Sequence, residues 1–325
     1  MTTFKDIRGT AVQSVSSDPT NPEVGQIWYN NTIGILKGYQ LTAAAWSAGG
    51  NLSTNADQRG GCGASQNSGL CFGGAPPTLA GTTATEEYDG STWTAGGNLS
   101  VARHALACAG TQTAGLGAGG YKGGSPDVSN STEEYDGSAW TAGGNLGTSR
   151  YRLSGCGIQT SGLAFGGTAA GVYKNNTEEY DGSSWTAGGN LINAANLMGS
   201  AGIQTAALGF GGVQPPRTNA TVEYDGSSWA AGGNLPTSLS GMGGVGTQND
   251  ALGFGGSNGT VFQTSTFNYN GSTWTTNPAS LTTVRNQAAS AGTQTSALAM
   301  SGSPNSIATE EWSGPSFATK KITTS

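Results

Sequence analysis

One phrase, repeated along the chain, constrains the fold more than any other feature of the sequence. The stretch Ala84–Leu99 reads ATEEYDGSTWTAGGNL. Close copies of it end at Leu146, Leu191 and Leu235. A second phrase, of the form AGTQTxxLxFGG, alternates with it in six copies, from Gly63–Gly74 to Ala291–Gly302. A period of about 45 residues that is rich in glycine and aromatic residues is typical of propellers and solenoids. The chain is therefore expected to be an array of similar supersecondary units.

Each repeat predicts four short β-strands. Glycine supplies 56 of the 325 residues and charged residues only 10%, which disfavours helices and favours short strands with tight turns. The first strand is a run of small residues such as Ala105–Gly110, and the second runs into the double glycine, as Leu163–Phe165 does. The third carries Glu-Glu-Tyr, and the fourth carries a tryptophan after an Asp-Gly turn, a strong hairpin signal. Small residues in the first strand suit a position crowded around a central axis.

Aromatic residues recur at fixed positions and are expected to pack between neighbouring sheets. Those of the fourth strand are Trp46, Trp93, Trp140, Trp185, Trp229 and Trp274, with Phe317 in the seventh place. Those of the third strand are Tyr88, Tyr135, Tyr180, Tyr224, Tyr269 and Trp312. Six double-glycine phrases predict an all-β, six-bladed β-propeller of four-stranded antiparallel blades over residues 41–325. Residues near Trp46 are expected to pair with the last repeat, residues 288–317. A seven-bladed ring that uses the N-terminal hairpin is the alternative.

A double glycine that ends a strand, followed by a tyrosine and then a tryptophan, resembles the kelch motif of β-propellers. The resemblance covers residues 46–317 and all six units, although Ala118 replaces the aromatic residue in one unit and Met300-Ser301 the aromatic and first glycine in the last. The repeated AGTQT and AGGNL phrases depart from kelch. They are similar to those of glycine-rich repeat proteins of tailed-bacteriophage virions.

The N-terminal region carries a second resemblance. Residues 1–20 show no period and are expected to be a leader that is flexible or is ordered by a partner. Residues 21–39 predict a hairpin, with apolar runs at Gln26–Tyr29 and Ile35–Tyr39. This hairpin resembles the P-x-x-G-x-x-W-Y-N-x-T-x-G hairpin of phage tail and fibre proteins. The matching residues are Pro22, Gly25, Trp28, Tyr29, Asn30, Thr32 and Gly34. The resemblance implies that residues 1–40 attach the chain to other virion proteins, through Trp28 and Tyr29; an ordinary hairpin that merely precedes the repeats is the alternative.

The repeats differ mainly in the connection between their second and third strands. In a four-stranded blade this connection emerges on the same face as the AGGNL turns. The variable residues that would decorate this face are Tyr121, Lys122, Tyr173, Lys174, Pro215, Pro216, Arg217 and Phe262. Aromatic rings beside cationic and amide side chains suit the recognition of a sugar or a protein. Tolerated loop variation without a binding role is the alternative.

Charge and cysteine usage narrow the classes of partner. The net charge of −6 and the lack of a Lys/Arg stripe disfavour nucleic acid. No window approaches a membrane span and the first residues contain no apolar signal segment, so membrane insertion and a cleavable signal are not expected. The cysteines Cys62, Cys71, Cys108 and Cys156 are expected to be small buried fillers. A bridge between Cys62 and Cys71 across the predicted turn at Gln66–Asn67 is left open.

The ionisable residues do not predict catalysis. The single histidine, His104, aligns with Gln58, Tyr151, Asn196, Ser240 and Asn286 when each repeat is counted back from its glutamine, so these positions are polar and uncharged. The Glu-Glu pairs recur with the fold and are expected to be structural, meeting Arg103 or Arg150 across blades. The aspartates of the Asp-Gly turns, Asp89, Asp136, Asp181 and Asp225, are expected to stabilise turns rather than bind calcium. No metal and no cofactor is predicted.

The function expected from these features is that of a non-enzymatic bacteriophage virion protein, associated with the tail or a fibre, that presents its variable face to a host-surface glycan or protein. A capsid decoration protein and a kelch-like glycan-binding or glycan-modifying enzyme domain are the alternatives. The receptor, the copy number and assembly into a homo-oligomer are left open.

Overall fold

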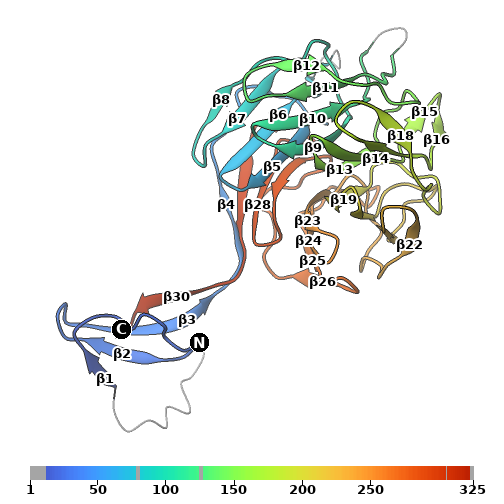
Figure 1. Ribbon diagram of the computed structural model, residues 1–325. Coiled ribbons are helices and arrows are strands. Elements are labelled where there is room, and N and C mark those ends of the chain that lie inside the picture. The colour runs from blue at the N-terminus through green and yellow to red at the C-terminus, as the bar shows by residue number, and fades with distance from the viewer. Residues whose placement is uncertain (1–11, 78–80, 124–126, 305, 323–325) are drawn as a thin grey trace. The chain divides into compact units, whose positions relative to one another are not determined.

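The protein is described by a computed structural model over residues 12–77, 81–123, 127–304 and 306–322. The regular structure of these residues consists of β-strands (Figure 1), which confirms the all-β prediction. The chain forms two compact units, one of residues 1–45 with 314–325 and one of residues 46–313.

The first unit contains one four-stranded sheet. Its strands are β1 (Gln13–Val15), β2 (Ile27–Asn30), β3 (Ile35–Thr42) and β30 (Ser316–Lys321), in the order β1-β2-β3-β30. Strands β2 and β3 pair antiparallel, so the predicted hairpin is confirmed. The Asp18 carboxylate accepts hydrogen bonds from Trp28 Nε1 at 3.0 Å, Asn30 Nδ2 at 2.9 Å and Lys37 Nζ at 2.5 Å. These donors, Lys37 first, lower the pKa of Asp18 to about 2.

The C-terminal residues correct two predictions. Phe317 does not occupy a seventh tryptophan position; it lies in β30, opposite Leu41 of β3. Residues 314–325 therefore belong to the first unit, and the division near the N-terminus falls after residue 45 rather than after residue 40. The expected domain of residues 41–325 is too long at both ends. The sequence signal was misleading because Phe317 falls in phase with the repeat although its strand pairs elsewhere.

In the described residues, the second unit contains six four-stranded sheets, numbered here in chain order. Sheet 1 comprises β5 (Gly60–Ser65), β6 (Ser68–Phe72), β7 (Thr85–Tyr88) and β8 (Trp93–Ala95). Sheet 2 comprises β9 (Ala107–Thr111), β10 (Ala114–Ala118), β11 (Thr132–Tyr135) and β12 (Trp140–Ala142). Sheet 3 comprises β13 (Ser154–Ile158), β14 (Ser161–Phe165), β17 (Thr177–Tyr180) and β18 (Trp185–Ala187).

The remaining three sheets follow the same plan. Sheet 4 comprises β19 (Gly199–Ile203), β20 (Ala206–Phe210), β21 (Thr221–Tyr224) and β22 (Trp229–Ala231). Sheet 5 comprises β23 (Gly243–Thr247), β24 (Asp250–Phe254), β25 (Thr266–Tyr269) and β26 (Trp274–Asn277). Sheet 6 comprises β27 (Ala289–Gly292), β28 (Ser296–Met300), β29 (Thr309–Ser313) and, from the other end of the repeats, β4 (Ala45–Ala48). The predicted pairing of Trp46 with the last repeat is confirmed.

The sheets have a propeller-like arrangement in which first strands lie against one another (Figure 1). Strand β9 contacts β5 and β13, and β27 contacts β23 and β5. The small residues of these strands are a steric requirement: a Cβ added to Gly61 would lie 2.7 Å from the Ala289 Cβ, and one added to Gly155 would lie 2.9 Å from the Ala107 Cβ. Such distances are shorter than two carbon atoms can approach without repulsion.

The double glycine of each sheet packs against the loop that enters the next sheet and forms hydrogen bonds with it. At Gly166, φ is +66° and an added Cβ would lie 2.6 Å from the Ala195 carbonyl oxygen. The N–H of Gly167 donates to that same oxygen at 2.8 Å. A residue with a side chain would therefore be strained in its backbone and would also separate the two segments.

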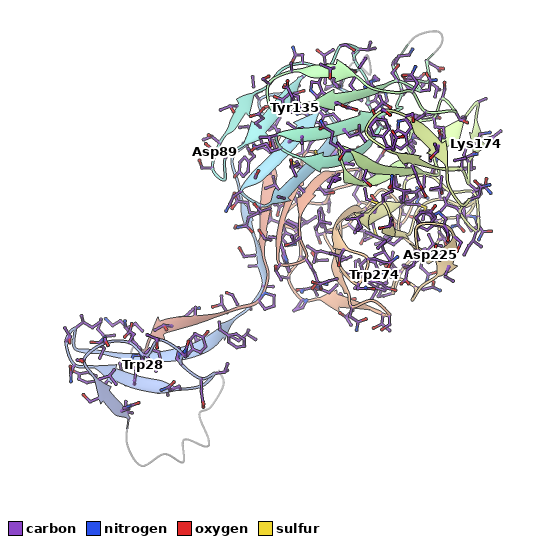
Figure 2. All side chains as sticks on the ribbon, in the orientation of Figure 1. Trp28, Asp89, Tyr135, Lys174, Asp225 and Trp274 are labelled. Carbon is purple, nitrogen blue, oxygen red and sulfur yellow. The ribbon has the colours of Figure 1, made fainter. Side chains whose placement is uncertain are left out.

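The recurring aromatic residues pack between sheets as predicted, and Figure 2 labels Tyr135 and Trp274 among them. The five tyrosines of the third strands and Trp312 are at most 1% exposed. Each repeat tryptophan donates its Nε1–H to a threonine of the preceding sheet, as Trp140 does to Thr85 at 2.9 Å. The corresponding pairs are Trp185–Thr132, Trp229–Thr177, Trp274–Thr221, Trp46–Thr266 and Trp93–Thr309. Trp93 belongs to sheet 1 and Thr309 to sheet 6.

Two further side-chain contacts repeat between sheets. The hydroxyl of Tyr88 donates to Glu311, and four other tyrosines donate to the second glutamate of the preceding sheet. The Nε2 of Gln159, in the AGTQT phrase, donates to the backbone carbonyls of Gly115 and Tyr135. The tyrosine and second glutamate of one phrase and the glutamine of the other thus serve the contacts between neighbouring sheets.

The first glutamates form buried ion pairs. Arg103 pairs with Glu133 at 2.7 Å, and Arg150 pairs with Glu178 at 2.8 Å. The structural role predicted for these residues is confirmed, but each pair lies within one sheet rather than between two. The reason is that the loop entering a sheet folds back over the third strand of that same sheet. Arg285–Glu310 is the corresponding pair of sheet 6, and in sheet 1 the first glutamate, Glu86, pairs with Arg59, which comes from a position further along the loop.

The cysteines are free and none of the four is exposed. Cys62 pairs in register with Leu70, and Cys71 pairs with Gly61. Cys62 and Cys71 therefore point to opposite faces of sheet 1, and the bridge between them that the sequence left open is not formed. Burial raises the pKa of Cys71 to about 11 and that of Cys156 to about 12, as expected for inert packing residues.

Candidate binding face and axial pocket

The variable connections and the loops that enter each sheet meet on one face of the second unit. In every sheet a residue just before the first strand forms an antiparallel β-bridge with the residue that follows the double glycine. These bridges are Asp57–Ala75, His104–Tyr121, Tyr151–Thr168, Asn196–Val213, Ser240–Ser257 and Asn286–Ser303. The two classes of loop thus share a surface, which we call the variable face.

The bridges correct one alignment. Counting back from each glutamine placed Gln58 with His104, whereas the structure places Asp57 there. The cause is a β-bulge between Gly63 and Ser65, which adds one residue to the first strand of sheet 1. The set of residues equivalent to His104 therefore includes one acid.

The residue after each bridge forms a belt around the axis of the sheets. The belt consists of Gln58, Ala105, Arg152, Leu197, Gly241 and Gln287, all with φ between 53° and 65°. The N–H of Ala105 donates to the Gln58 carbonyl, and the same bond continues from each belt residue to the one before it as far as Gln287. Non-glycine residues with positive φ are strained, and they persist where surrounding bonds fix them.

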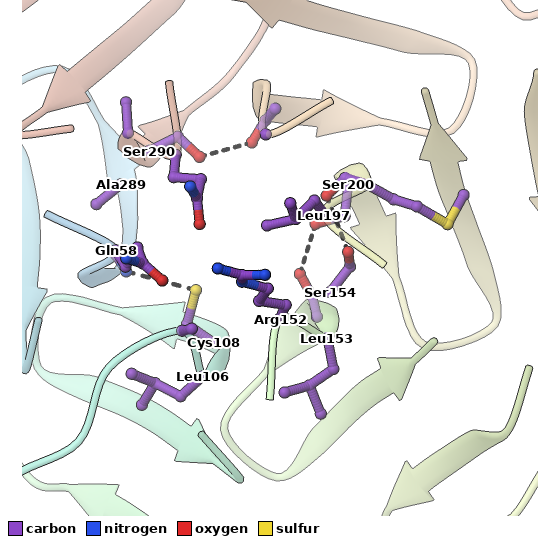
Figure 3. A pocket seen from close by; sticks show the side chains of 18 of the residues that line it. Gln58, Leu106, Cys108, Arg152, Leu153, Ser154, Leu197, Ser200, Ala289 and Ser290 are labelled. Carbon is purple, nitrogen blue, oxygen red and sulfur yellow. Dashed lines mark hydrogen bonds between the residues drawn. The ribbon is translucent and has the colours of Figure 1, made fainter. Parts of the chain in front are cut away.

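The belt surrounds the mouth of an axial pocket (Figure 3), a cavity of about 110 Å³. Leu106, Leu153 and Met198 also line it, together with the small residues of the first strands. The hydroxyls of Ser154, Ser200 and Ser290 donate to backbone carbonyls and stiffen these walls. About 10–15 Å³ of such volume holds one water molecule, so the pocket has room for several waters or for a small polar group.

Arg152 gives the axial pocket a charged group that could bind a ligand. It is the single charged residue of the belt, and its side chain reaches toward the centre of the pocket, between Gln58 and Leu197 (Figure 3). Its Nε is buried and has no hydrogen-bond partner. In the described part of the chain, no carboxylate lies within ion-pairing distance of it. A second pocket arginine, Arg59, is already paired with Glu86 at 2.9 Å.

Aromatic rings extend from the variable face to Arg152. The rings of His104 and Tyr121 are 5.2 Å apart, and those of Tyr121 and Tyr151 are 5.5 Å apart. The guanidinium carbon of Arg152 lies 5.5 Å from the centre of the Tyr151 ring. The three rings form an aromatic strip that leads from a variable loop to Arg152 at the axial pocket.

His104 is part of this strip, and its two ring nitrogens are buried without hydrogen-bond partners. Burial lowers the pKa of His104, Asp57 opposes this effect and Arg152 adds to it. His104 is therefore a neutral, packed ring at pH 7. The expectation of a histidine that is exposed or hydrogen-bonded is therefore wrong, because His104 is buried by its packing against Tyr121 and has no polar partner.

The predicted binding residues all lie on or beside the variable face, but in two settings. Tyr121, Lys122, Tyr173 and Lys174 are half-buried, with Tyr173 in the short hairpin of β15 (Thr168–Ala169) and β16 (Val172–Tyr173). Figure 2 shows Lys174 beside this hairpin. Pro215, Pro216, Arg217 and Phe262 are exposed. The Nε of Arg217 donates to Ser240 Oγ at 2.9 Å, which holds this loop against the next sheet.

The sequence did not single out Arg152 or the belt. One sequence feature could have pointed to Arg152: it follows the position equivalent to His104, and the residues at its own position in the other repeats are uncharged. This difference gains a meaning only in the folded chain, where the belt brings six residues that are far apart in the sequence to one axis.

The aspartates of the Asp-Gly turns serve the turns, as predicted. Asp89 Oδ1 accepts from the N–H groups of Ser91 and Thr92 at 2.8 and 2.7 Å, and the other three make equivalent bonds. Among the described residues, no cluster of three or more His, Cys, Asp or Glu side chains is placed to hold a metal ion. Nor does that part of the chain contain a helix long and apolar enough to span a membrane.

No protein-family model matches the chain, and a search of curated proteins finds no relative of it.

Proposed function

We propose that the second unit is a closed six-bladed β-propeller that acts as a non-enzymatic recognition module of a phage virion. Six sheets supply six blades, and two repeated contacts together with one strand pairing support closure. The Trp–Thr hydrogen bonds form a cycle that includes Trp93–Thr309, Tyr88 donates to Glu311, and β4 completes the sheet formed by the end of the repeats. A seventh blade would need the N-terminal hairpin, which is paired with β30 in the first unit.

The observation that carries the recognition role is that the repeated residues and the variable residues lie in different places and make different contacts. Repeated glutamates, tyrosines, glutamines and tryptophans are engaged in contacts within and between sheets. The loops that differ gather on one face, around the axial pocket, with aromatic, cationic and amide groups. A face of this composition suits a host-surface glycan or protein, because rings stack on apolar sugar faces while amides and cations bind hydroxyls and acids.

The first unit is proposed to attach the propeller to the tail or a fibre. The proposal comes from the resemblance of the hairpin at residues 21–39 to those of phage tail and fibre proteins. Trp28 is buried and its Nε1 is bound to Asp18, so its role within this unit is to fix the hairpin. Tyr29 is 40% exposed and is the better candidate for a contact with a virion partner.

Mass spectrometry of purified particles of the phage that encodes this chain tests the virion assignment. The protein should be present in stoichiometric amounts, and its absence would remove the assignment.

A glycan array tests the recognition face separately. Tyr173→Ala and Arg217→Ala should weaken binding, because both residues lie on the variable face. Thr160→Ala, in the hairpin between β13 and β14 at the other end of the strands, is the matched control and should bind like the unaltered protein. Equal binding by all variants would contradict the proposed face.

A further inference from the structure

We propose that the axial pocket binds the carboxylate of an acidic sugar through Arg152, with the sugar ring lying on the aromatic strip. This inference rests on the proposed recognition function and specifies the chemistry of its ligand. The steps that lead to it are the state of Arg152, the surroundings of its guanidinium group, and the shape of the approach.

Arg152 is a cation whose backbone the fold fixes and whose side chain has no counter-charge among the described residues. Its backbone is fixed by the belt, since its N–H donates to the Ala105 carbonyl at 2.7 Å and its own carbonyl accepts from Leu197 at 3.1 Å. The other described arginines that face the interior of the sheets, among them Arg103 and Arg150, each have a buried glutamate partner. A positioned guanidinium with free donors selects carboxylates, to which it forms two parallel hydrogen bonds.

The acid at the bridge position of sheet 1, Asp57, does not satisfy Arg152. The carboxylate of Asp57 accepts from Ser303 Oγ at 2.6 Å and from Gln58 Nε2 at 3.4 Å, so it is engaged by neighbours on its own side of the belt. The amide groups of Gln58 and Gln287 lie around the same mouth and can bind hydroxyls next to a carboxylate.

The dimensions of the site favour a sugar acid that enters by one end. A cavity of about 110 Å³ has room for a carboxylate and the carbon that bears it. The sugar ring is placed at the mouth, because the Tyr151 ring lies there beside the Arg152 guanidinium and the Tyr121 ring lies next to Tyr151. Stacking of an apolar sugar face on such rings, together with one buried charge contact, is a sufficient recognition element for a terminal acidic residue.

The chain provides its own control substitution. Arg152→Gln installs the residue that occupies the same belt position in sheets 1 and 6, where Gln58 and Gln287 adopt the same positive φ. The variant should therefore fold, and an unchanged melting temperature would verify this. Arg152→Lys keeps the charge but loses the two-pronged donor, and it should bind with intermediate affinity.

The experiment measures binding of glucuronate-terminated oligosaccharides and of their glucose-terminated counterparts, by calorimetry, to the unaltered protein and to Arg152→Gln. We expect the unaltered protein to prefer the glucuronate form, and Arg152→Gln to lose about tenfold or more of that affinity while its binding of the neutral form stays the same. In a nitrogen-15 spectrum, the Arg152 Nε–H signal should shift only with the acidic ligand.

The outcomes separate this inference from the proposed function. If oligosaccharides bind, and Tyr173→Ala weakens them, but no preference for the acid exists or Arg152→Gln leaves it unchanged, the inference is overturned and the recognition face stands. If the acid binds and depends on Arg152 while Tyr173→Ala and Arg217→Ala have no effect, the axial site stands and the wider face is overturned. If neither sugar binds, both glycan proposals are overturned.

Discussion

At the scale of single residues, one buried position shows two chemical solutions within one chain. Sheets 2, 3 and 6 hold an arginine that pairs with the first glutamate of the third strand. Sheet 5 places Leu239 and Phe267 at the same positions, both buried. The glutamate also accepts the N–H that follows the AGGNL phrase, as Glu178 does from Gly147 at 2.6 Å. In sheet 5 that residue is Pro236, which has no N–H to satisfy. The three positions have changed together.

Arg150→Leu alone should therefore destabilise the protein strongly, by about 3–5 kcal/mol, because it leaves the buried Glu178 without its counter-charge. The triple variant Arg150→Leu, Glu178→Phe, Gly147→Pro, which copies sheet 5, should recover most of that loss. Urea unfolding at pH 7 measures both free energies. A triple variant as unstable as the single one would show that the three positions do not act as a set.

The tyrosine hydroxyls between sheets give a second residue-scale prediction. Burial, and then the hydrogen bond to Glu87, raise the pKa of Tyr135 from 10.0 to about 12, and Tyr88, Tyr180 and Tyr224 are raised alike. The raised pKa means that the contribution to stability is complete below pH 10 and is lost as the pH rises from 10 to 12. Alkaline unfolding, followed by circular dichroism and by tyrosinate absorbance, should occur in this window. Tyr135→Phe should weaken the pH dependence, and a protein whose tyrosines ionise near pH 10 while folded would contradict the account.

At the scale of elements, each Asp-Gly turn stabilises the connection between the third and fourth strands of its own sheet. Hydrogen bonds from the backbone of Thr92, then from Ser91, lower the pKa of Asp89 from 3.8 to about 2, and Asp181 and Asp225 are lowered similarly. A lowered pKa contributes stability above pH 4 that is lost as the pH falls from 4 toward 2. Asn270 makes the same turn bonds in sheet 5 without titrating.

Replacing Asp89, Asp181 and Asp225 together by asparagine should therefore flatten the loss of stability between pH 4 and pH 2. Thermal unfolding at a series of pH values measures this slope. The same three substitutions should have a small effect at pH 7, because asparagine keeps the turn. An unchanged acid slope would show that other carboxylates dominate acid unfolding.

Elements that repeat could be predicted from the sequence, and elements that do not repeat could not. Periodicity and turn chemistry predict the four strands of each repeat, the aromatic residues that pack between sheets and the pairing of Trp46 with the last repeat. Strand β30 was missed because its pairing with β3 joins two segments at opposite ends of the chain that share no pattern. The bulge at Gly63–Ser65 was missed because it changes the register without changing the phrase. The axial pocket depends on the register of the first strands and on the proposed closure of the ring. Nothing in the sequence therefore distinguished Arg152 from the other variable positions.

At the scale of the whole repeat unit, each sheet is held mainly by its neighbours, and the interface between sheets 6 and 1 decides whether the array is a ring. Two of the repeated contacts recur at that interface: Trp93 donates to Thr309 at 3.0 Å, and Tyr88 donates to Glu311. The glycines of β5 and the alanines of β27 meet as the other first strands do. The belt draws one residue from each of the six sheets, and its hydrogen bonds fix the backbone of Arg152. The proposed ligand chemistry therefore depends on the ring.

Nuclear Overhauser effects between tryptophan indole N–H groups and threonine methyl groups test the ring most directly. Four pairs within the array, Trp140–Thr85, Trp185–Thr132, Trp229–Thr177 and Trp274–Thr221, serve as internal references because they join sheets that follow one another in the chain. The account predicts that Trp93–Thr309 and Trp46–Thr266 show effects of the same strength. Strong reference signals without a Trp93–Thr309 signal would mean that the sheets form an open stack, and the propeller with its axial site would be contradicted.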